Sequence, residues 1–283
     1  MPESIRIRNI SRSEMDQLVD WAADEGWNPG LHDAACFYAT DPLGFFIAEL
    51  QGNPIGCISA VAYGDAFGFV GFYIVKPGFR GRGYGHQLWQ TAMNYMSGRN
   101  VGLDGVASQQ ENYKKSGFHL AYNNIRYEAK NMTLTGKKPR TSIVPLDQLT
   151  FNELAAYDAN VFSVERRLFL QPWISQPNAV ALGSVGNGRL SGYGMMRTCR
   201  QGCKIGPLFA DTAEVAAELL EALTENVPGT TVYLDVPAVN PSAMSVAGQY
   251  RMQPVFETAR MYTGEPPNIL LDKVFGVTSF ELG

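Results

Sequence analysis

Residues 71–93 read GFYIVKPGFRGRGYGHQLWQTAM, and this stretch decides the fold. An apolar strand pattern ends before a loop with three glycines, and an amphipathic helix pattern begins directly after that loop. Gly81, Gly83 and Gly85 have no Cβ atom, so they tolerate positive φ and allow a ligand to approach the backbone closely. Free N–H groups at the start of the helix attract anions. The stretch therefore predicts a binding site for a phosphate or pyrophosphate.

Two other glycine-rich phosphate loops are excluded by the neighbouring residues. A P-loop requires Lys followed by Ser or Thr after its last glycine, where this chain has His86 and Gln87. A dinucleotide fingerprint would require glycine at position 86 and follows the first strand of its domain. The loop here follows the fourth predicted strand, and Arg80 and Arg82 add positive charge at its rim.

A second motif supports a family resemblance. Arg80, Gly83 and Gly85 match the pattern R-x-x-G-x-G, and residues 113–118 (YKKSGF) match Y-x-K-x-G-F, with a short apolar strand pattern between the two. In this order, over about residues 5–128, the chain resembles the GNAT superfamily of N-acyltransferases. The resemblance implies acetyl-CoA (coenzyme A) as the co-substrate and no metal.

The resemblance also assigns roles to individual residues. In the family the fourth and fifth strands splay apart, and backbone groups of the fourth strand hold the pantetheine arm and stabilise the thioester oxygen. Tyr113 matches the tyrosine that often protonates the leaving thiolate, a task suited to a phenol; packing alone is the alternative role. The implied coenzyme-binding residues are Tyr73, Ile74, Val75, Arg80, Gly81, Arg82, Gly83, Tyr84 and Gly85.

The general base is less well defined by the sequence. Many family members place a glutamate on the fourth strand, but this strand (FGFVGFYIV) has no acidic residue. Asp104, inside the apolar strand pattern NVGLDGV, is the best candidate because a buried carboxylate needs a task or a partner. Asp65 and His32 are weaker candidates, and proton loss to a water relay stays open. The family's usual asparagine after the fifth strand is also absent.

The acceptor pocket is expected from the first helices and their loops. Trp27 and Asn28 lie in the unusual turn GWNPG, and His32 and Tyr38 follow it on a predicted short helix. Loops carry recognition more often than cores do. A role of Trp27 in closing a hydrophobic core is the alternative.

The second half repeats the order of elements of the first. We therefore predict an α/β fold (α+β, mixed sheet) with two GNAT-like domains, each a central, mostly antiparallel twisted sheet flanked by helices. Residues 1–130 form the acetyl-CoA-binding domain, residues 131–141 a polar, basic linker, and residues 142–283 a degenerate GNAT-like domain. Asp211 stands where pyrophosphate would bind, and Ala247 stands in the place of Tyr113. The second half is expected to wall the acceptor cleft or to dock as a pseudo-dimer; two unrelated domains are the alternative.

Composition restricts the class of protein. Of 283 residues 45% are hydrophobic and 18% charged, which indicates folded cores. The net charge of −4 disfavours a nucleic-acid partner. The start MPESIRIRNI has no signal-peptide pattern and no apolar run is long enough to span a bilayer, so we expect a cytoplasmic monomer or homodimer with no membrane partner. The four cysteines form no convincing metal site.

These observations predict an N-acetyltransferase. It would transfer acetyl from acetyl-CoA to a small-molecule amine, amino acid or polyamine by direct attack in a ternary complex, and a longer acyl group is a variant. An acyl-CoA-binding regulatory or scaffolding protein without turnover is the alternative from another class. Modification of protein N-termini or lysines would need an open groove.

Overall fold

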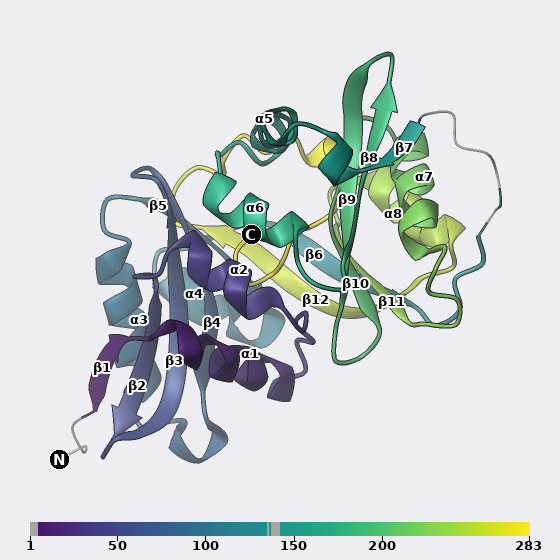
Figure 1. The fold of residues 1–283 in the computed structure, drawn as a ribbon. Coiled ribbons are helices and arrows are strands. Elements are labelled where there is room, and N and C mark those ends of the chain that lie inside the picture. The colour runs from purple at the N-terminus through teal and green to yellow at the C-terminus, as the bar shows by residue number, and fades with distance from the viewer. Residues whose placement is uncertain (1–4, 135, 137–141) are drawn as a thin grey trace.

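The protein is described by a computed structural model that covers residues 5–134, 136 and 142–283. Figure 1 shows two halves packed side by side, the first in purple and blue and the second in green and yellow. Most of the predicted linker, 131–141, lies outside the described residues. The first half contains β1 (Arg6–Asn9), α1 (Met15–Asp24), α2 (Asp33–Thr40), β2 (Phe45–Leu50), β3 (Asn53–Tyr63), β4 (Phe67–Val75), α3 (Tyr84–Tyr95), β5 (Asn100–Val106), α4 (Gln110–Lys115) and β6 (His119–Ala129).

The second half has the same order of elements, as predicted. Its first long helix begins at a capping box, in which the Thr150 hydroxyl accepts a hydrogen bond from the N–H of Glu153 and the N–H of Thr150 donates to the Glu153 carboxylate. The elements are β7 (Ser142–Pro145), α5 (Phe151–Phe162), α6 (Arg167–Ile174), β8 (Val180–Gly186), β9 (Arg189–Thr198), β10 (Cys203–Ala210), α7 (Ala213–Thr224), β11 (Val232–Pro237), α8 (Pro241–Gln249), β12 (Gln253–Tyr262) and β13 (Val274–Gly276).

All described strands belong to one mixed sheet. Its order is β1-β2-β3-β4-β5-β12-β6-β11-β10-β9-β8-β7, and β13 pairs with β10. The pairs β4–β5 and β10–β11 are parallel and the others are antiparallel. The last long strand of each half therefore crosses over: β12 pairs with β5 of the first half, and β6 pairs with β11 of the second. The α/β class is confirmed, but the two sheets expected from the sequence are joined into one.

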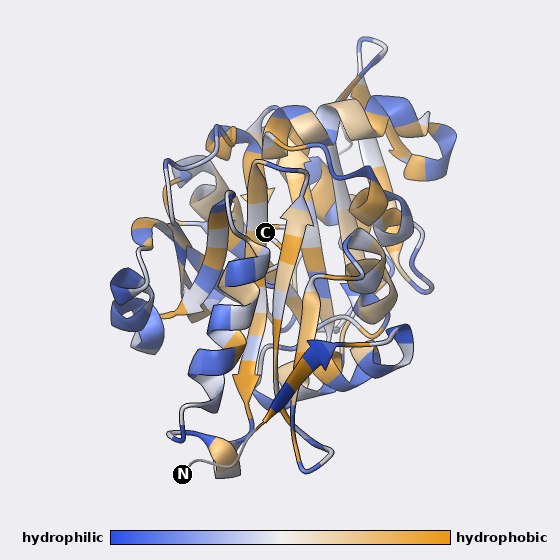
Figure 2. Ribbon diagram, turned by 90° about the vertical axis from the view of Figure 1, so that its left-hand side faces the viewer, coloured by the Kyte–Doolittle hydropathy of each residue, from blue (hydrophilic) through white to orange (hydrophobic). Residues whose placement is uncertain are grey.

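Helices cover both faces of this sheet. On one face of the first half, α3 packs Leu88, Trp89 and Ala92 onto β2, β3, β4 and β5. On the other face lie α1 and α2, and here Phe37 of α2 stacks on Trp173 of α6 with ring centroids 5.8 Å apart. One hydrophobic core therefore extends through both halves, and Figure 2 shows apolar residues along the strands between the helical layers. No helix among the described residues has both the length and the apolarity to cross a bilayer.

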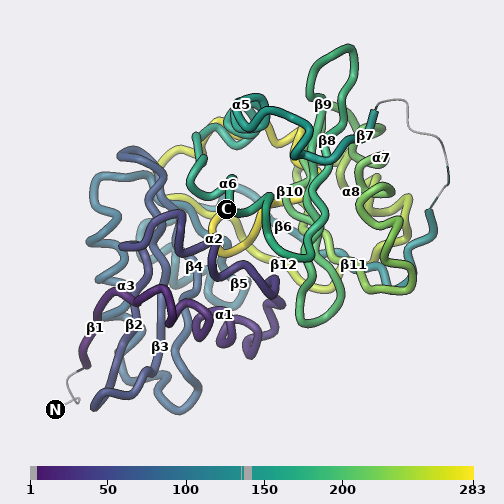
Figure 3. The backbone as a smooth tube through the Cα atoms, viewed as in Figure 1, coloured from purple at the N-terminus to yellow at the C-terminus, as the bar shows by residue number. Residues whose placement is uncertain are grey.

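Two features of this framework position the site. The pairing of β4 with β5 runs from Phe67 to Val70 and from Asn100 to Leu103 and then stops, so the two strands diverge. Residues 274–283, here called the closing segment, follow the last long strand and are buried throughout. Figure 3 shows the chain reaching the centre of the molecule between the two halves at the end of this segment. The segment lies directly beside the gap between β4 and β5, because Gly71 contacts its backbone.

Candidate active site

A cavity of about 660 Å³ fills the gap where β4 and β5 diverge. Its walls come from β4, the loop before α3, β5 and α4 of the first half, and from β12 and the closing segment of the second half. Of the residues predicted from the sequence, the cavity is lined by Trp27, Tyr73, Ile74, Val75, Arg80, Gly81, Gly83, Gly85, Asp104 and Tyr113.

The glycine loop has the conformation that an anion site requires. Gly81 and Gly83 have φ of 76° and 81°, and Gly83 is the N-cap of α3. A Cβ atom added at either position would meet nothing within 4 Å, so this side of the loop is open. A Cβ at Gly85 would instead lie 2.8 Å from the Tyr73 hydroxyl, so this glycine lets the helix approach β4. The first turn of the helix therefore offers free N–H groups and space for a diphosphate.

The two arginines of the loop have different surroundings. Arg80 donates from Nε to the Val75 carbonyl oxygen at 2.6 Å and forms an ion pair with Glu25. It thus fixes the loop against β4 and α1. Arg82 lies over the Phe79 ring at 5.8 Å and does not line the cavity. The Tyr84 side chain is 3% exposed and packs in the core beneath α3, so only its backbone can contact a ligand.

β4 carries a bulge at the point where it leaves β5. Ser59 of β3 pairs with Gly71 and Cys57 pairs with Ile74, so two residues of β4 are left over between these pairs. One of them, Phe72, has φ of 46°, a conformation that bulky non-glycine residues rarely adopt. The bulge turns the backbone of residues 73–75 along the cavity edge, where N–H groups can stabilise an oxyanion.

Tyr113 lies across the gap from β4. Its ring packs against Trp89 with centroids 5.5 Å apart and covers Gly105, where a Cβ would lie 2.4 Å from the ring. Burial, with a smaller effect of Tyr73, raises the pKa of Tyr113 to about 12. The phenol therefore stays protonated at neutral pH, and its hydroxyl donates to no acceptor among the described residues. It is free to give a proton to a ligand atom.

Asp104 is held in a buried ion pair. Arg260 of β12 donates from Nε and Nη2 to its two oxygens at 2.8 and 2.6 Å, and the Asn124 amide donates at 2.8 Å. Burial raises the pKa of Asp104, and the Arg260 charge opposes that rise. Both oxygens are engaged, so this carboxylate joins β5 to β12 and β6. The weaker base candidate Asp65 lies in an exposed turn, 3.8 Å from Arg99, and does not line the cavity.

Only one of the four predicted acceptor residues reaches the cavity. Trp27 lines it, and its carbonyl oxygen accepts hydrogen bonds from Arg126 at 2.8 Å and Lys204 at 3.2 Å. Asn28 instead exchanges hydrogen bonds with the backbone of Gln201, which ties the two halves together. His32 lines a separate hollow beside α6, and Tyr38 packs against the core.

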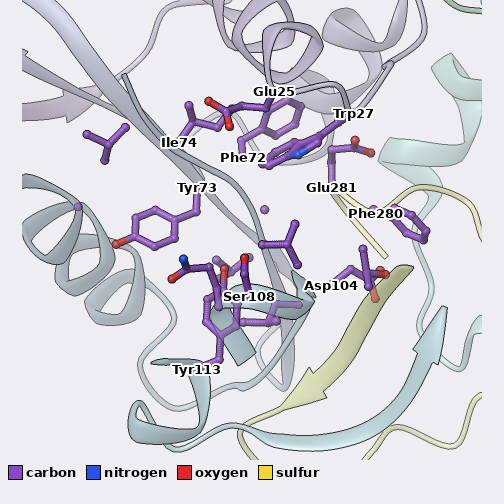
Figure 4. Close-up of a pocket in the computed structure, with 18 of the residues that line it drawn as sticks. Glu25, Trp27, Phe72, Tyr73, Ile74, Asp104, Ser108, Tyr113, Phe280 and Glu281 are labelled. Carbon is purple, nitrogen blue, oxygen red and sulfur yellow. The ribbon is translucent and has the colours of Figure 1, made fainter. Parts of the chain in front are cut away.

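Four cavity residues from the second half are not predicted by any sequence pattern. Phe256 and Thr258 lie on β12, and Phe280 and Glu281 lie in the closing segment. Figure 4 shows Glu281 beside Trp27 and Phe280 on one side of the cavity and Tyr113 on the other. The Thr258 hydroxyl is buried without a hydrogen-bond partner among the described residues, which leaves it available to a ligand.

The corresponding gap in the second half is closed. β10 and β11 are parallel over Cys203–Ile205 and then diverge, as β4 and β5 do. β13 fills this gap: it pairs with β10 at Leu208 and Phe209, and the N–H of Val277 donates to the Asp235 carbonyl oxygen of β11 at 2.7 Å. Backbone groups that would be free for a pantetheine arm are thus paired with the chain itself.

Comparison with known proteins agrees with this duplicated architecture. A family model described as "Acetyltransferase (GNAT) family" matches residues 7–118, and one described as "Acetyltransferase (GNAT) domain" matches residues 154–276. Holothin acyltransferase of Pseudoalteromonas sp. (strain SANK 73390) is 30% identical over 276 residues, which is 96% of this chain and 92% of that protein. The chain is a tandem GNAT acyltransferase.

Solved structures show the same fold for the tandem GNAT chain. A protein of Pyrococcus horikoshii assigned as an acetyltransferase superimposes with a TM-score of 0.84 at 21% identity, over 99% of this chain and 96% of that one. A tandem GNAT protein from the clavulanic acid biosynthesis pathway has a TM-score of 0.64 at 13% identity, over 93% of this chain and 100% of that one. The described part of this acyltransferase contains no cluster of three or more side chains that could hold a metal.

Proposed function

We propose that this GNAT enzyme is an N-acetyltransferase that transfers acetyl from acetyl-CoA to a small-molecule primary amine. One observation carries the proposal. One cavity is lined by the open glycine loop at Gly81 and Gly83, by the bulged edge of β4 and by Tyr113. A long donor with a diphosphate at one end and a thioester at the other fits such a cavity.

The chemistry follows from the groups that line this cavity. The N–H groups at the start of α3 and in the glycine loop would bind the diphosphate. Backbone N–H groups of residues 73–75 would stabilise the negative charge on the thioester oxygen while the amine attacks the carbonyl carbon. Tyr113 would protonate the leaving sulfur, because its raised pKa keeps the proton in place until a thiolate forms. Donor and acceptor would react directly in a ternary complex.

The position of the second half supports a small acceptor. Phe256 and Phe280 of the second half line the cavity, whereas a protein substrate would need an open groove. The closing segment is held there by the hydrogen bond from the Tyr63 hydroxyl to the Leu282 carbonyl oxygen at 2.8 Å. The name of the Pseudoalteromonas relative specifies acyl rather than acetyl transfer, so longer donors are the natural variant.

The test combines binding and turnover in the full chain. Coenzyme A is titrated calorimetrically, and thiol release is then followed with acetyl-CoA and longer acyl-CoA donors against a panel of amines, holothin included, and a lysine-containing peptide. We expect thiol release with acetyl-CoA and a small amine, an N-acetylated product by mass spectrometry, and none with the peptide. Coenzyme binding without turnover across the panel would instead support the scaffolding alternative.

A further inference from the structure

Glu281 is a buried residue whose carboxylate has no hydrogen-bond partner among the described residues. Its residue is 4% exposed and lines the cavity, yet no hydrogen bond reaches its side chain among the described residues. A buried charge without a partner is costly, and proteins keep such groups where a ligand or a reaction uses them. Asp104 lines the same cavity, but its oxygens are already bound by Arg260 and Asn124.

The closing segment holds Glu281 in a fixed place. Before it, the Thr278 hydroxyl accepts a hydrogen bond from buried Arg166 at 2.9 Å. After it, the N–H of Leu282 donates to the Ser279 hydroxyl at 3.1 Å. The backbone of Glu281 also presses against Gly71, where an added Cβ would lie 2.2 Å from the Glu281 carbonyl oxygen. The backbone of Glu281 therefore lies against β4 next to its bulge, and Glu281 lines the same cavity, in which the thioester carbonyl is expected.

The surroundings of Glu281 raise its pKa. Burial is the largest cause, Asp33 adds to the rise, and the nearby cations oppose it without cancelling it. Those cations have other partners: Arg126 binds Asp235, Arg197 binds Asp33, and Lys204 donates to Trp27. A carboxylate whose pKa is raised by burial and lowered by nearby cations can accept a proton and release it again during a reaction. The charged and titratable groups that act on Glu281 or share its cavity are Glu25, Asp33, Tyr73, Arg80, His86, Asp104, Tyr113, Arg126, Arg197 and Lys204.

The walls beside Glu281 are aromatic. Trp27 and Phe72 come from the first half, and Phe256 and Phe280 from the second. Flat rings on several sides favour a flat apolar ligand, and Glu281 favours an amino group on it. The buried Thr258 hydroxyl adds a single polar contact.

We propose that Glu281 takes the proton from the amino group of the acceptor, and that the aromatic walls select a flat, aromatic or heteroaromatic primary amine. The inference rests on the proposed function. As the nitrogen lone pair attacks the thioester carbon, an N–C bond forms and a proton leaves nitrogen for the Glu281 carboxylate. The C–S bond then breaks, its electron pair goes to sulfur, and Tyr113 protonates that sulfur. Solvent takes the proton from Glu281 and returns one to Tyr113.

The test uses Glu281→Gln, which keeps the size of the side chain but cannot accept the proton. With benzylamine as acceptor and acetyl-CoA as donor, kcat is expected to fall about 100-fold or more, with unchanged affinity for coenzyme A. In Glu281→Gln, the loss of activity at low pH that is caused by protonation of Glu281 is expected to disappear. The pH dependence caused by protonation of the amine is expected to remain. Formate is expected to restore part of the activity of Glu281→Ala. Glu265→Gln, on an exposed residue outside the cavity, is the matched control.

The possible outcomes separate the two proposals. Full activity of Glu281→Gln, or a rise in KM alone with an intact pH profile, would overturn the role as base. Putrescine turning over better than benzylamine would overturn the assignment of acceptor class. An unmodified protein that transfers acetyl to no amine would overturn the proposed function itself. Thermal melting shows whether each variant is folded, and the formate rescue tests the role of the carboxylate even where Glu281→Gln loses stability.

Discussion

Gly71 on β4 contacts the backbone of Glu281 so closely that an added methyl group would lie 2.2 Å from the carbonyl oxygen of Glu281. This contact joins the bulged strand of one half to the closing segment of the other. The same segment fills the gap between β10 and β11 of the second half. One stretch of chain therefore closes the cavity that the second half would have had and completes the cavity of the first.

Substituting Gly71→Ala tests this contact. The new Cβ must displace either β4 or the closing segment, and overpacking of this kind costs about 1–3 kcal/mol of unfolding free energy. Acyl transfer is expected to fall by about 100-fold, since small misplacements of catalytic groups have effects of that size, while coenzyme A still binds. The measurements are urea unfolding, calorimetry and thiol release.

Gly248→Ala provides the control for that substitution. This glycine lies in α8 and an added Cβ meets nothing within 4 Å, so the variant should be as stable as the original chain or slightly more so. Normal turnover in Gly71→Ala would mean that the closing segment has no part in the reaction.

Gly83→Glu tests the diphosphate site. The substitution places a carboxylate where the diphosphate is expected, and two like charges about 4 Å apart near a surface repel by about 4 kcal/mol. We expect coenzyme A affinity to fall up to about a thousandfold by calorimetry, as that free energy implies. Gly98→Glu is matched because Gly98 has φ of 83°, near the 81° of Gly83, and also has open space. Equal coenzyme affinity in the two variants would contradict the assignment of the loop.

Much of the fold follows from local sequence patterns. The predicted fourth strand, FGFVGFYIV, is observed as β4 with the same bounds, because an apolar and aromatic run bordered by turn residues specifies a strand locally. The positive φ of Gly81 and Gly83 also agrees with the expectation, since glycine is the residue that adopts it without strain. These features depend on residues that are neighbours in the chain.

The crossing of strands between the halves could not be predicted in this way. β6 and β12 end their halves with similar patterns, and nothing local specifies whether each pairs with its own half or with the other. The position of Glu281 in the cavity could not be predicted either, because it depends on the path of the closing segment through the fold. Asn28, His32 and Tyr38 are expected in the acceptor pocket because the first helices and their loops often carry recognition. The turn instead directs Asn28 to Gln201, and the helix directs Tyr38 to the core.

Tyr113→Phe tests the donation of a proton to sulfur. Removing the hydroxyl is expected to lower kcat about 100-fold while KM for acetyl-CoA changes little, because the ring still packs on Trp89. The pKa of about 12 keeps the phenol protonated, so the unmodified enzyme should lose no activity between pH 7 and pH 9 through this group. Tyr233→Phe, on β11 and outside the cavity, is the control. An alkaline limb near pH 8 that is absent from Tyr113→Phe would contradict this view.

Asp104→Asn separates a structural carboxylate from a catalytic one. The variant leaves the Arg260 guanidinium buried beside a neutral amide, and breaking a buried ion pair costs about 3–5 kcal/mol. The loss is measured by urea unfolding, with Asp16→Asn as control, because that exposed pair with Arg12 at 3.9 Å contributes about 1 kcal/mol or less. Replacing both partners, Asp104→Leu with Arg260→Met, should recover most of the stability, since no charge is then left unpaired.

If Asp104→Asn instead kept full stability and lost turnover together with the acidic limb of the pH profile, Asp104 rather than Glu281 would be the base, because only a group that accepts the proton produces that combination.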